Sequence, residues 1–250
     1  MKIGLLGLSN PCSSIKVEQT KEKLMKHNVV VSPYLSMEAT PQQRASVWNA
    51  WMKQKDFDYI FDISGGDLAN ECIPYLDFNL YKDIKTVYVG YSDCTVILNS
   101  LYKVAQKPCL LFQIRDSIYD FFEEDVYSIQ WNHREGNVQG IVVGGNIRCL
   151  LKLAGTPYFP DCTDKILFLE SMSGNAYRIR TYFAQLKMMP EVMNVKAIVL
   201  GQFSELDKDG LDDCLYDCLK EWHVPVFRTK DIGHSHDSKA LWIGKEIHVC

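Results

Sequence analysis

A serine stands where an apolar, β-branched segment changes into a helical pattern within residues 87–105. Gly90 lies two residues before Ser92, and Asp93 follows it. One interpretation is helix capping, because Ser and Asp side chains accept hydrogen bonds from the free N–H groups of a first helical turn. The other is a nucleophile elbow, a sharp strand-to-helix turn that exposes the serine hydroxyl and needs small neighbours. Cys94 stands where the usual elbow has a second glycine, so this stretch alone leaves both interpretations open.

A second candidate for chemistry is Glu170, which lies near the end of the almost wholly apolar segment 165–171. That segment predicts a buried strand, where a carboxylate is costly unless it is paired. Glu170 would therefore form a structural ion pair or helix cap, or it would orient a catalytic histidine. His234, after Gly233 in a loop between apolar segments, is the candidate histidine. Serine hydrolases use the chain order serine, glutamate, histidine, but order alone leaves the structural interpretation open.

The glycine pair Gly65-Gly66 follows an expected strand over 59–63 and precedes Asp67. The pair could simply form a turn that requires positive φ angles. A nucleotide-binding loop is disfavoured, because the chain has neither a G-x-G-x-x-G motif nor a Walker lysine. With a serine nearby, exposed N–H groups of this loop could form half of an oxyanion hole, and the residue after the nucleophile would supply the other half.

Two patterns could hold a metal ion, and neither is complete. His234 and His236 form a His-x-His pair without an evident third ligand. Cys214 and Cys218 lie on one face of a helix expected over 212–222, and no second cysteine pair matches them, which favours core packing. The nine cysteines are scattered, odd in number and mostly in apolar surroundings, as in reduced proteins of the cytosol.

Length and charge exclude several classes of protein. A chain of 250 residues with 47% apolar content can bury a large core. A net charge of −4 without any basic run argues against nucleic acid as the main partner. The apolar start of the chain is short and is followed by polar residues, so it makes a poor signal peptide, and no apolar run approaches the length of a membrane span. We therefore expect a cytoplasmic protein without a membrane partner.

Strands and helices alternate along the part of the chain that must position these side chains. Periodicity predicts the following elements: strands over 2–8, 29–33, 59–63 and up to Ser92, and helices over 14–27 and 42–55. This alternation predicts an α/β fold with a parallel sheet and with ligand sites at the carboxyl ends of its strands. After an acidic, aromatic and weakly periodic segment over 116–138, the second half restarts. It has strand patterns at 141–146, 165–171 and 196–203 and a helical pattern at 147–154.

Taken together, these motifs resemble those of the LD-carboxypeptidases, a family of serine peptidases that includes the microcin C immunity enzymes. The resemblance covers residues 40–95, 140–171, 197–203 and 231–236. Its most specific marks are Gly90-x-Ser92-Asp93-x-Thr95, Gly144-Gly145-Asn146, the strand ending in Glu170, and Gly233-His234. Four motifs in the right order favour the nucleophile interpretation of Ser92 over helix capping.

The resemblance implies a two-domain architecture. An N-terminal parallel-sheet domain of flavodoxin or Rossmann type, residues 1–115, would carry the serine elbow. Residues 116–138 would form a linker or lid, and a smaller mixed α/β domain, residues 139–250, would bring the glutamate and histidine across a groove.

The resemblance also implies the chemistry: hydrolysis of the amide between an L-configured centre and the terminal D-alanine of a cell-wall tetrapeptide. Ser92 would be the nucleophile, His234 the general base and Glu170 the group that orients the imidazole. The N–H groups of Asp93 and Gly66 would face the oxyanion. Three further residues are expected to bind substrate: Gly65, Asp67 and Asn70. No metal or cofactor is implied.

Some features depart from the common family pattern. The chain is short for the family, and Arg180 and Thr181 stand where an acidic residue and then an arginine are expected. Asn70 and the sequence YLDF at 75–78 look more like the microcin-immunity branch. These departures leave two alternatives open: the same triad acting on a peptidyl- or aminoacyl-nucleotide amide, and a non-catalytic binding protein on the same scaffold. An aromatic-rich lid that could stack on a base gives mild support to the first alternative, although such residues more often pack a domain interface: Tyr119, Phe121, Phe122 and Trp131. A homodimer also stays open.

Overall fold

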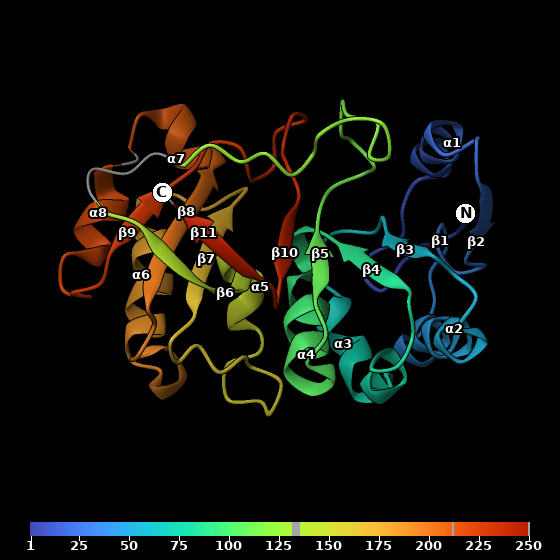
Figure 1. Cartoon of the computed structure of the whole chain (residues 1–250), viewed down its shortest axis with the longest axis horizontal. Coiled ribbons are helices and arrows are strands. Elements are labelled where there is room, and N and C mark those ends of the chain that lie inside the picture. The colour runs from blue at the N-terminus through green and yellow to red at the C-terminus, as the bar shows by residue number, and fades with distance from the viewer. Residues whose placement is uncertain (132–135, 212, 250) are drawn as a thin grey trace.

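The computed structural model describes residues 1–131, 136–211 and 213–249. Within these residues the strands form a six-stranded and a five-stranded sheet, which lie side by side with helices packed on their faces (Figure 1). Most neighbouring strands are parallel, which confirms the expected α/β class.

The first sheet carries the elements that lead to the serine. Its strands, in spatial order, are β10 (Leu241–Ile243), β5 (Cys109–Leu111), β4 (Val87–Gly90), β3 (Tyr59–Asp62), β1 (Lys2–Leu6) and β2 (Asn28–Val31). Its helices and 3₁₀ turns are α1 (Ser14–Lys23), α2 (Pro41–Gln54), α3 (Ala69–Cys72), η1 (Ile73–Tyr75), η2 (Phe78–Tyr81), η3 (Ser92–Cys94) and α4 (Thr95–Ala105). Because β1, β3 and β4 are parallel, the loops after them meet at one edge of the sheet.

The second sheet carries the expected glutamate. Its strands, in spatial order, are β11 (Glu246–Val249), β6 (Val138–Asn146), β7 (Ile166–Ser171), β8 (Ala197–Phe203) and β9 (Val226–Arg228). Its helices and 3₁₀ turn are α5 (Ile147–Leu151), α6 (Ala176–Lys187), η4 (Pro190–Val192), α7 (Ser204–Asp209) and α8 (Asp213–Leu219). The expected elements occur with ends shifted by a few residues. Residue 212, where a helix was expected to begin, lies outside the described residues.

Helix α2 shows how local sequence sets these elements. Thr40 and Gln43 form a reciprocal capping box at its start, and Pro41 occupies the first turn. Its apolar stripe buries Trp48, Trp51 and Met52. The stripe faces β1, where a Cβ added to Gly4 would lie 2.6 Å from the Trp51 ring. A larger residue at that position would therefore push the helix off the sheet.

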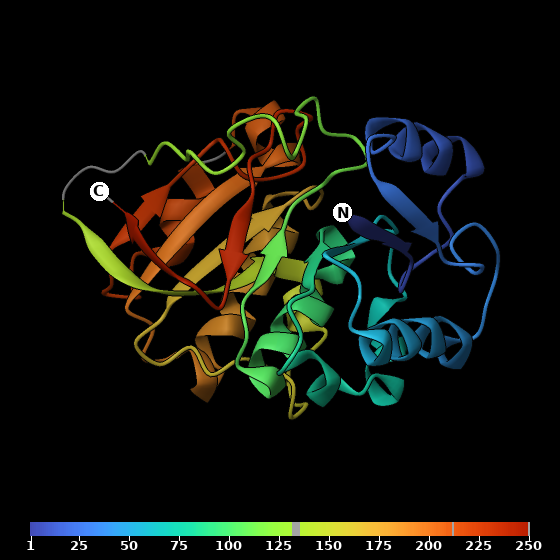
Figure 2. The same ribbon diagram turned by 45° about the vertical axis from the view of Figure 1, so that its right-hand side comes forward.

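The C-terminal segment joins the two sheets. Strand β10 pairs antiparallel with β5, and β11, which follows the turn at Gly244, pairs antiparallel with β6. Strand β10 therefore belongs to the first sheet, although its residues lie in the second half of the chain (Figure 2). It covers an edge of β5 that would otherwise expose unpaired backbone groups.

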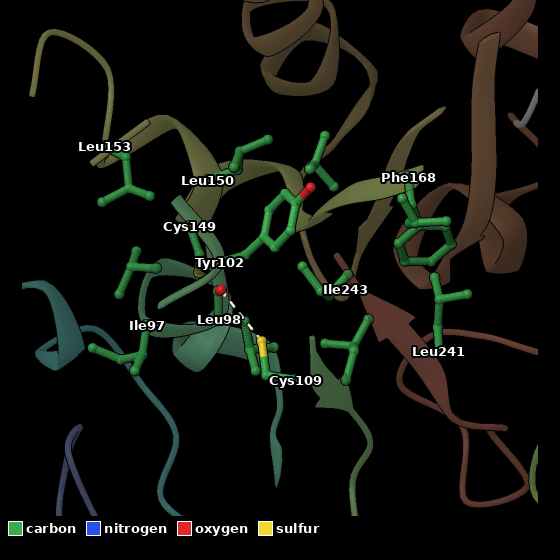
Figure 3. Close-up of a cluster of buried hydrophobic side chains, with 14 of the residues drawn as sticks. Ile97, Leu98, Tyr102, Cys109, Cys149, Leu150, Leu153, Phe168, Leu241 and Ile243 are labelled. Carbon is green, nitrogen blue, oxygen red and sulfur yellow. Dashed lines mark hydrogen bonds between the residues drawn. The ribbon is translucent and has the colours of Figure 1, made fainter. Parts of the chain in front are cut away.

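A hydrophobic core continues from one half of the molecule to the other. Figure 3 shows Ile97, Leu98 and Tyr102 of α4 beside Cys149 and Leu150 of α5. Leu241 and Ile243 of β10 and Phe168 of β7 belong to the same cluster (Figure 3). Since the halves share buried side chains, a change in their relative position would expose apolar surface.

The segment after β5 runs across the top of the structure toward β6 (Figures 1 and 2). The aromatic ring of Phe121 packs edge-on against those of Tyr59 and Phe61 on the first sheet, and Phe122 contacts Tyr59 in the same way. These two rings are therefore engaged in packing against the first sheet. Residues 132–135 of the expected linker or lid lie outside the described residues.

Candidate active site

The structure brings the three expected catalytic side chains into one hydrogen-bonded row. His234 Nε2 lies 3.2 Å from Ser92 Oγ, and His234 Nδ1 lies 2.7 Å from Glu170 Oε2. The serine begins η3, the glutamate is near the end of β7, and the histidine lies in the loop after β9. This row is the arrangement in which a histidine can take a proton from a serine while a carboxylate holds the opposite ring nitrogen.

Ser92 adopts the backbone of a sharp turn. Its φ angle is +53°, a left-handed value that is uncommon for a residue other than glycine. A Cβ added to Gly90 would lie 2.8 Å from Cys94 Cβ, so the turn needs a residue without a side chain at that position. No side-chain cap hydrogen bond occurs at the start of η3 or of α4. The capping interpretation is therefore wrong, and the Ser92 hydroxyl contacts His234 instead.

Glu170 is fully buried, and the side chain that hydrogen-bonds to its carboxylate is His234 itself. The neighbouring strand β8 makes room for it with Gly201, where an added Cβ would lie 3.1 Å from Glu170 Cβ. Oxygen Oε1 of this carboxylate is also buried and has no hydrogen-bond partner among the described residues. Among the described residues, the hydrogen bond with the imidazole is therefore the main interaction that offsets the cost of burying this carboxylate.

The loop that carries His234 is held by residues that the sequence did not single out. The hydroxyl groups of Tyr91 and Ser238 both donate to Gly233 O, at 2.6 and 2.8 Å. The Tyr91 ring also packs against the His234 ring, with centroids 4.6 Å apart. Burial, and then the charge of Glu170, raises the pKa of Tyr91 well above its ordinary value, so the phenol keeps its proton and remains a donor.

Residues of the family motifs connect the two halves beside the serine. The backbone N–H of Asn146 donates to Thr95 Oγ1 at 3.0 Å. The Asn99 amide donates to Gly144 O at 2.8 Å and accepts from Gly144 N at 2.9 Å. Asn146 is in register with Glu170 on the paired strands β6 and β7. The helix that follows the serine is thus tied to the strand beside the glutamate.

The glycine loop lies against the loop that follows β1, where Gly65 forms a backbone bridge with Asn10. Gly66 has a φ angle of +120°, and a Cβ added there would lie 2.1 Å from Asn10 Oδ1. That oxygen accepts from Asp67 N at 2.7 Å, so the loop needs glycine for both its angle and its close approach. Arg148, from α5, forms an ion pair with Asp67 and is the main cause of the lowered pKa of that carboxylate.

Asp93 joins the glycine loop to the serine turn. Its carboxylate is fully buried, and Oδ2 accepts from Ser9 Oγ at 2.6 Å and from Ala69 N at 2.8 Å. Its other oxygen accepts from Lys152 Nζ at 2.6 Å.

The expected substrate residue Asn70, at the start of α3, is exposed. Residues Ser9 and Lys152 were not predicted, and no local motif marks them.

The two patterns considered for a metal have other contacts. His236 Nδ1 lies 2.8 Å from Asp116 O, and both ring nitrogens of His234 already contact protein groups. Cys214 and Cys218 pack against the core. In the described part of the chain, no group of three His, Cys, Asp or Glu residues is arranged to hold a metal ion.

Arg180 and Thr181, the residues that depart from the family pattern, line a groove between α6 and α8. Ser92, Glu170 and His234 do not line this groove.

Comparisons with known proteins assign both halves of the chain to one family, the LD-carboxypeptidases. The profile of the LD-carboxypeptidase N-terminal domain matches residues 3–110, and that of the LD-carboxypeptidase C-terminal domain matches residues 139–249. In an alignment 261 residues long, the chain is 24% identical to the microcin C7 self-immunity protein MccF of Escherichia coli. The alignment covers 84% of this chain and 76% of that protein.

Two solved structures show the same fold. The crystal structure of muramoyltetrapeptide carboxypeptidase from Oxalobacter formigenes has a TM-score of 0.85 at 22% identity, covering 99% of this chain and 94% of that one. The structure of MccF in complex with glutamyl sulfamoyl guanosine has a TM-score of 0.85 at 20% identity, covering 99% and 92%. The helices of the described residues are all too short or too polar to cross a bilayer.

Proposed function

The chain belongs to the LD-carboxypeptidase family and is a serine-type carboxypeptidase, and we propose that it removes the terminal D-alanine from a cell-wall tetrapeptide with a Ser92–His234–Glu170 triad. The observation that carries this proposal is the pair of hydrogen bonds of His234, 3.2 Å to Ser92 Oγ and 2.7 Å to Glu170 Oε2. The name of the muramoyltetrapeptide carboxypeptidase with the same fold supports the choice of substrate.

In the first step Ser92 Oγ attacks the carbonyl carbon of the scissile amide. His234 Nε2 takes the hydroxyl proton and then gives it to the leaving amine of D-alanine as the C–N bond breaks. The resulting acyl-enzyme is hydrolysed by water, which His234 activates in the same way. Glu170 accepts the hydrogen bond from Nδ1–H throughout, so it fixes the tautomer and offsets the positive charge on the imidazolium.

The oxyanion would be stabilised by the backbone N–H groups of Asp93 and Gly66. The N–H of Asp93 lies in the first turn of η3, where helix geometry provides no intrahelical partner. Gly66 lies in the adjacent loop, and the segment that follows this loop is tied to the serine turn by the hydrogen bond from Ala69 N to Asp93 Oδ2. Gly65, Asp67 and Asn70 are proposed to line the substrate side of this loop.

A second candidate substrate is a peptidyl- or aminoacyl-nucleotide amide, which the same triad could cleave. The relation to the microcin C7 self-immunity protein, and the fold shared with its complex with glutamyl sulfamoyl guanosine, favour this candidate. The packing of Phe121 and Phe122 against the first sheet removes one argument for it, because these rings are engaged elsewhere.

The test is to incubate the purified protein with a muropeptide tetrapeptide and, separately, with an aminoacyl sulfamoyl adenylate, and to identify the products by mass. We expect release of D-alanine from the tetrapeptide by the wild type and none by Ser92→Ala. Cleavage of the nucleotide compound alone would replace the first substrate with the second. Tight binding of either compound without any cleavage would show a non-catalytic binding protein.

A further inference from the structure

Lys152 contacts both segments that carry the proposed oxyanion donors. It lies at the end of α5, in the second half of the chain. Its Nζ donates to Asp93 Oδ1 at 2.6 Å and to Asp67 O at 2.9 Å. One of these residues follows the serine, and the other follows Gly66. A single ammonium group from the second half therefore reaches the serine turn and the glycine loop of the first half.

The charges around this ammonium form one linked group, because Lys152 Nζ also lies 3.3 Å from Asp67 Oδ1. Asp93 is fully buried. Among the described residues, the cationic side chain that contacts its carboxylate is Lys152. Arg148 pairs with Asp67, which is exposed at the rim. The remaining contacts of the Asp93 carboxylate, with Ser9 Oγ and Ala69 N, are neutral hydrogen bonds. Removing Lys152 would therefore leave a buried negative charge without a positive partner.

A buried carboxylate beside the serine would oppose the reaction unless it is balanced. The tetrahedral intermediate places a second negative charge on the substrate oxygen, next to the backbone N–H of Asp93. Charges interact strongly in a site from which water is excluded, so an unbalanced Asp93 would raise the energy of the transition state. A paired Asp93 keeps its structural hydrogen bonds and adds no net charge.

We propose that Lys152 is a positioning residue of the oxyanion site that acts through Asp93. Its ammonium balances the buried carboxylate next to Ser92, which allows the carboxylate to hold the serine turn and the glycine loop together without opposing the oxyanion. This inference rests on the proposed function, because it assumes that Ser92 is the nucleophile and that the N–H of Asp93 faces the oxyanion.

The test uses a fluorophosphonate probe, which needs no knowledge of the natural substrate. Ser92 Oγ forms a bond to phosphorus, the P–F bond breaks, fluoride leaves, and the serine proton passes to His234. The rate of labelling at Ser92 is measured for the wild type, Lys152→Met, Asp93→Asn and the double variant Lys152→Met/Asp93→Asn. Lys107→Met is the control, because Lys107 is a half-buried lysine that donates to Ile84 O and Thr86 O and contacts none of the site residues.

We expect Lys152→Met to slow labelling by about tenfold or more. The loss of a direct oxyanion donor costs about 10²–10³ in rate, and Lys152 acts only indirectly, through Asp93. The double variant should return to within about threefold of the wild type, because coupled charges are strongly non-additive. Lys107→Met should label at the wild-type rate. Melting temperatures are measured in parallel. If Lys152→Met does not fold, Lys152→Gln replaces it, since its amide can donate to Asp93 without a charge.

Two outcomes overturn the inference while the proposed function stands. In one, Lys152→Met labels as fast as the wild type. In the other, the double variant stays as slow as Lys152→Met, which would make Lys152 a mechanical tether instead of a balancing charge. A wild type that is not labelled at Ser92 would overturn the proposed function, and the inference would fall with it.

Discussion

The backbone N–H of Asn146 donates to the hydroxyl of Thr95 across the junction between the two halves, at 3.0 Å. Thr95 begins the helix that follows the serine turn, and Asn146 ends the strand that pairs with the strand of Glu170. The nucleophile and the carboxylate of the proposed triad are therefore held at a fixed separation by the same hydrogen bonds that join the halves.

The first prediction concerns this junction. Asn99→Ala should lower stability by about 2–4 kcal/mol, because it leaves the buried N–H and C=O of Gly144 without partners. Turnover of the folded fraction should fall as well, since the strand beside Glu170 is no longer aligned. Ser100→Ala is the matched control, because the Ser100 hydroxyl donates to Val96 O of its own helix. Equal activity loss in both variants would contradict a special role for the junction. Chemical denaturation and kinetics provide the two measurements.

The second prediction concerns the backbone at Ser92. Ser92→Ala should abolish turnover and leave the protein folded, since triad nucleophiles carry roughly 10⁶ in rate. Ser92→Gly should also be inactive, yet it should be more stable than Ser92→Ala by about 0.5–1 kcal/mol, because glycine accepts a φ angle of +53° without strain. Activity above a tenth of the wild type in either variant would remove Ser92 from the mechanism.

The third prediction concerns the buried carboxylate. Glu170→Gln should reduce turnover by about 10²–10⁴, because the amide cannot support the imidazolium and can favour the wrong tautomer. Stability should hold or rise slightly, because Glu170 Oε1 has no partner to lose among the described residues. Glu205→Gln, which alters a carboxylate that accepts from Gly174 N, is a control for the substitution itself. A destabilised Glu170→Gln protein with full activity would show a structural role only.

The fourth prediction concerns the histidine loop. Tyr91→Phe should cost about 1 kcal/mol of stability and lower kcat roughly tenfold, because Gly233 O loses one of its two donors and His234 is held less firmly. Tyr81→Phe removes a buried phenol that donates to Pro108 O and accepts from Tyr88 N, so it should lower the melting temperature without changing kcat. An unchanged kcat in Tyr91→Phe would mean that the other contacts of the loop, such as those of Ser238 and Gln202, position His234 without the phenol.

The fifth prediction concerns pH and lies outside the site. Burial lowers the pKa of Lys107 from 10.5 to about 8 in the folded protein. Between these two values the unfolded chain binds more protons than the folded one, so this group adds stability as the pH rises through that window. The melting temperature of the wild type relative to Lys107→Met should therefore increase from pH 7.5 to about pH 10. Lys53→Met, at an exposed position, should show no such trend.

The sequence by itself determined the local parts of this protein. Periodicity predicted the strands and helices, because the repeat of apolar residues reports which face of an element is buried. The spacing of Gly90 and Ser92 predicted a sharp turn, because the crowding that requires glycine there comes from Cys94, four residues away. The identities of Ser92, Glu170 and His234 as candidates came from residue types, chain order and the resemblance to a family.

Only the tertiary structure decided what each of these residues contacts. The bond from Tyr91 to Gly233, the pairing of β10 with β5 and the contact of Lys152 with Asp93 join residues far apart in the chain. Such contacts depend on how strands pair and halves dock, which local periodicity does not encode. For the same reason the sequence could not tell that Phe121 and Phe122 pack against the first sheet, because an aromatic residue has the same pattern in a lid and in a core.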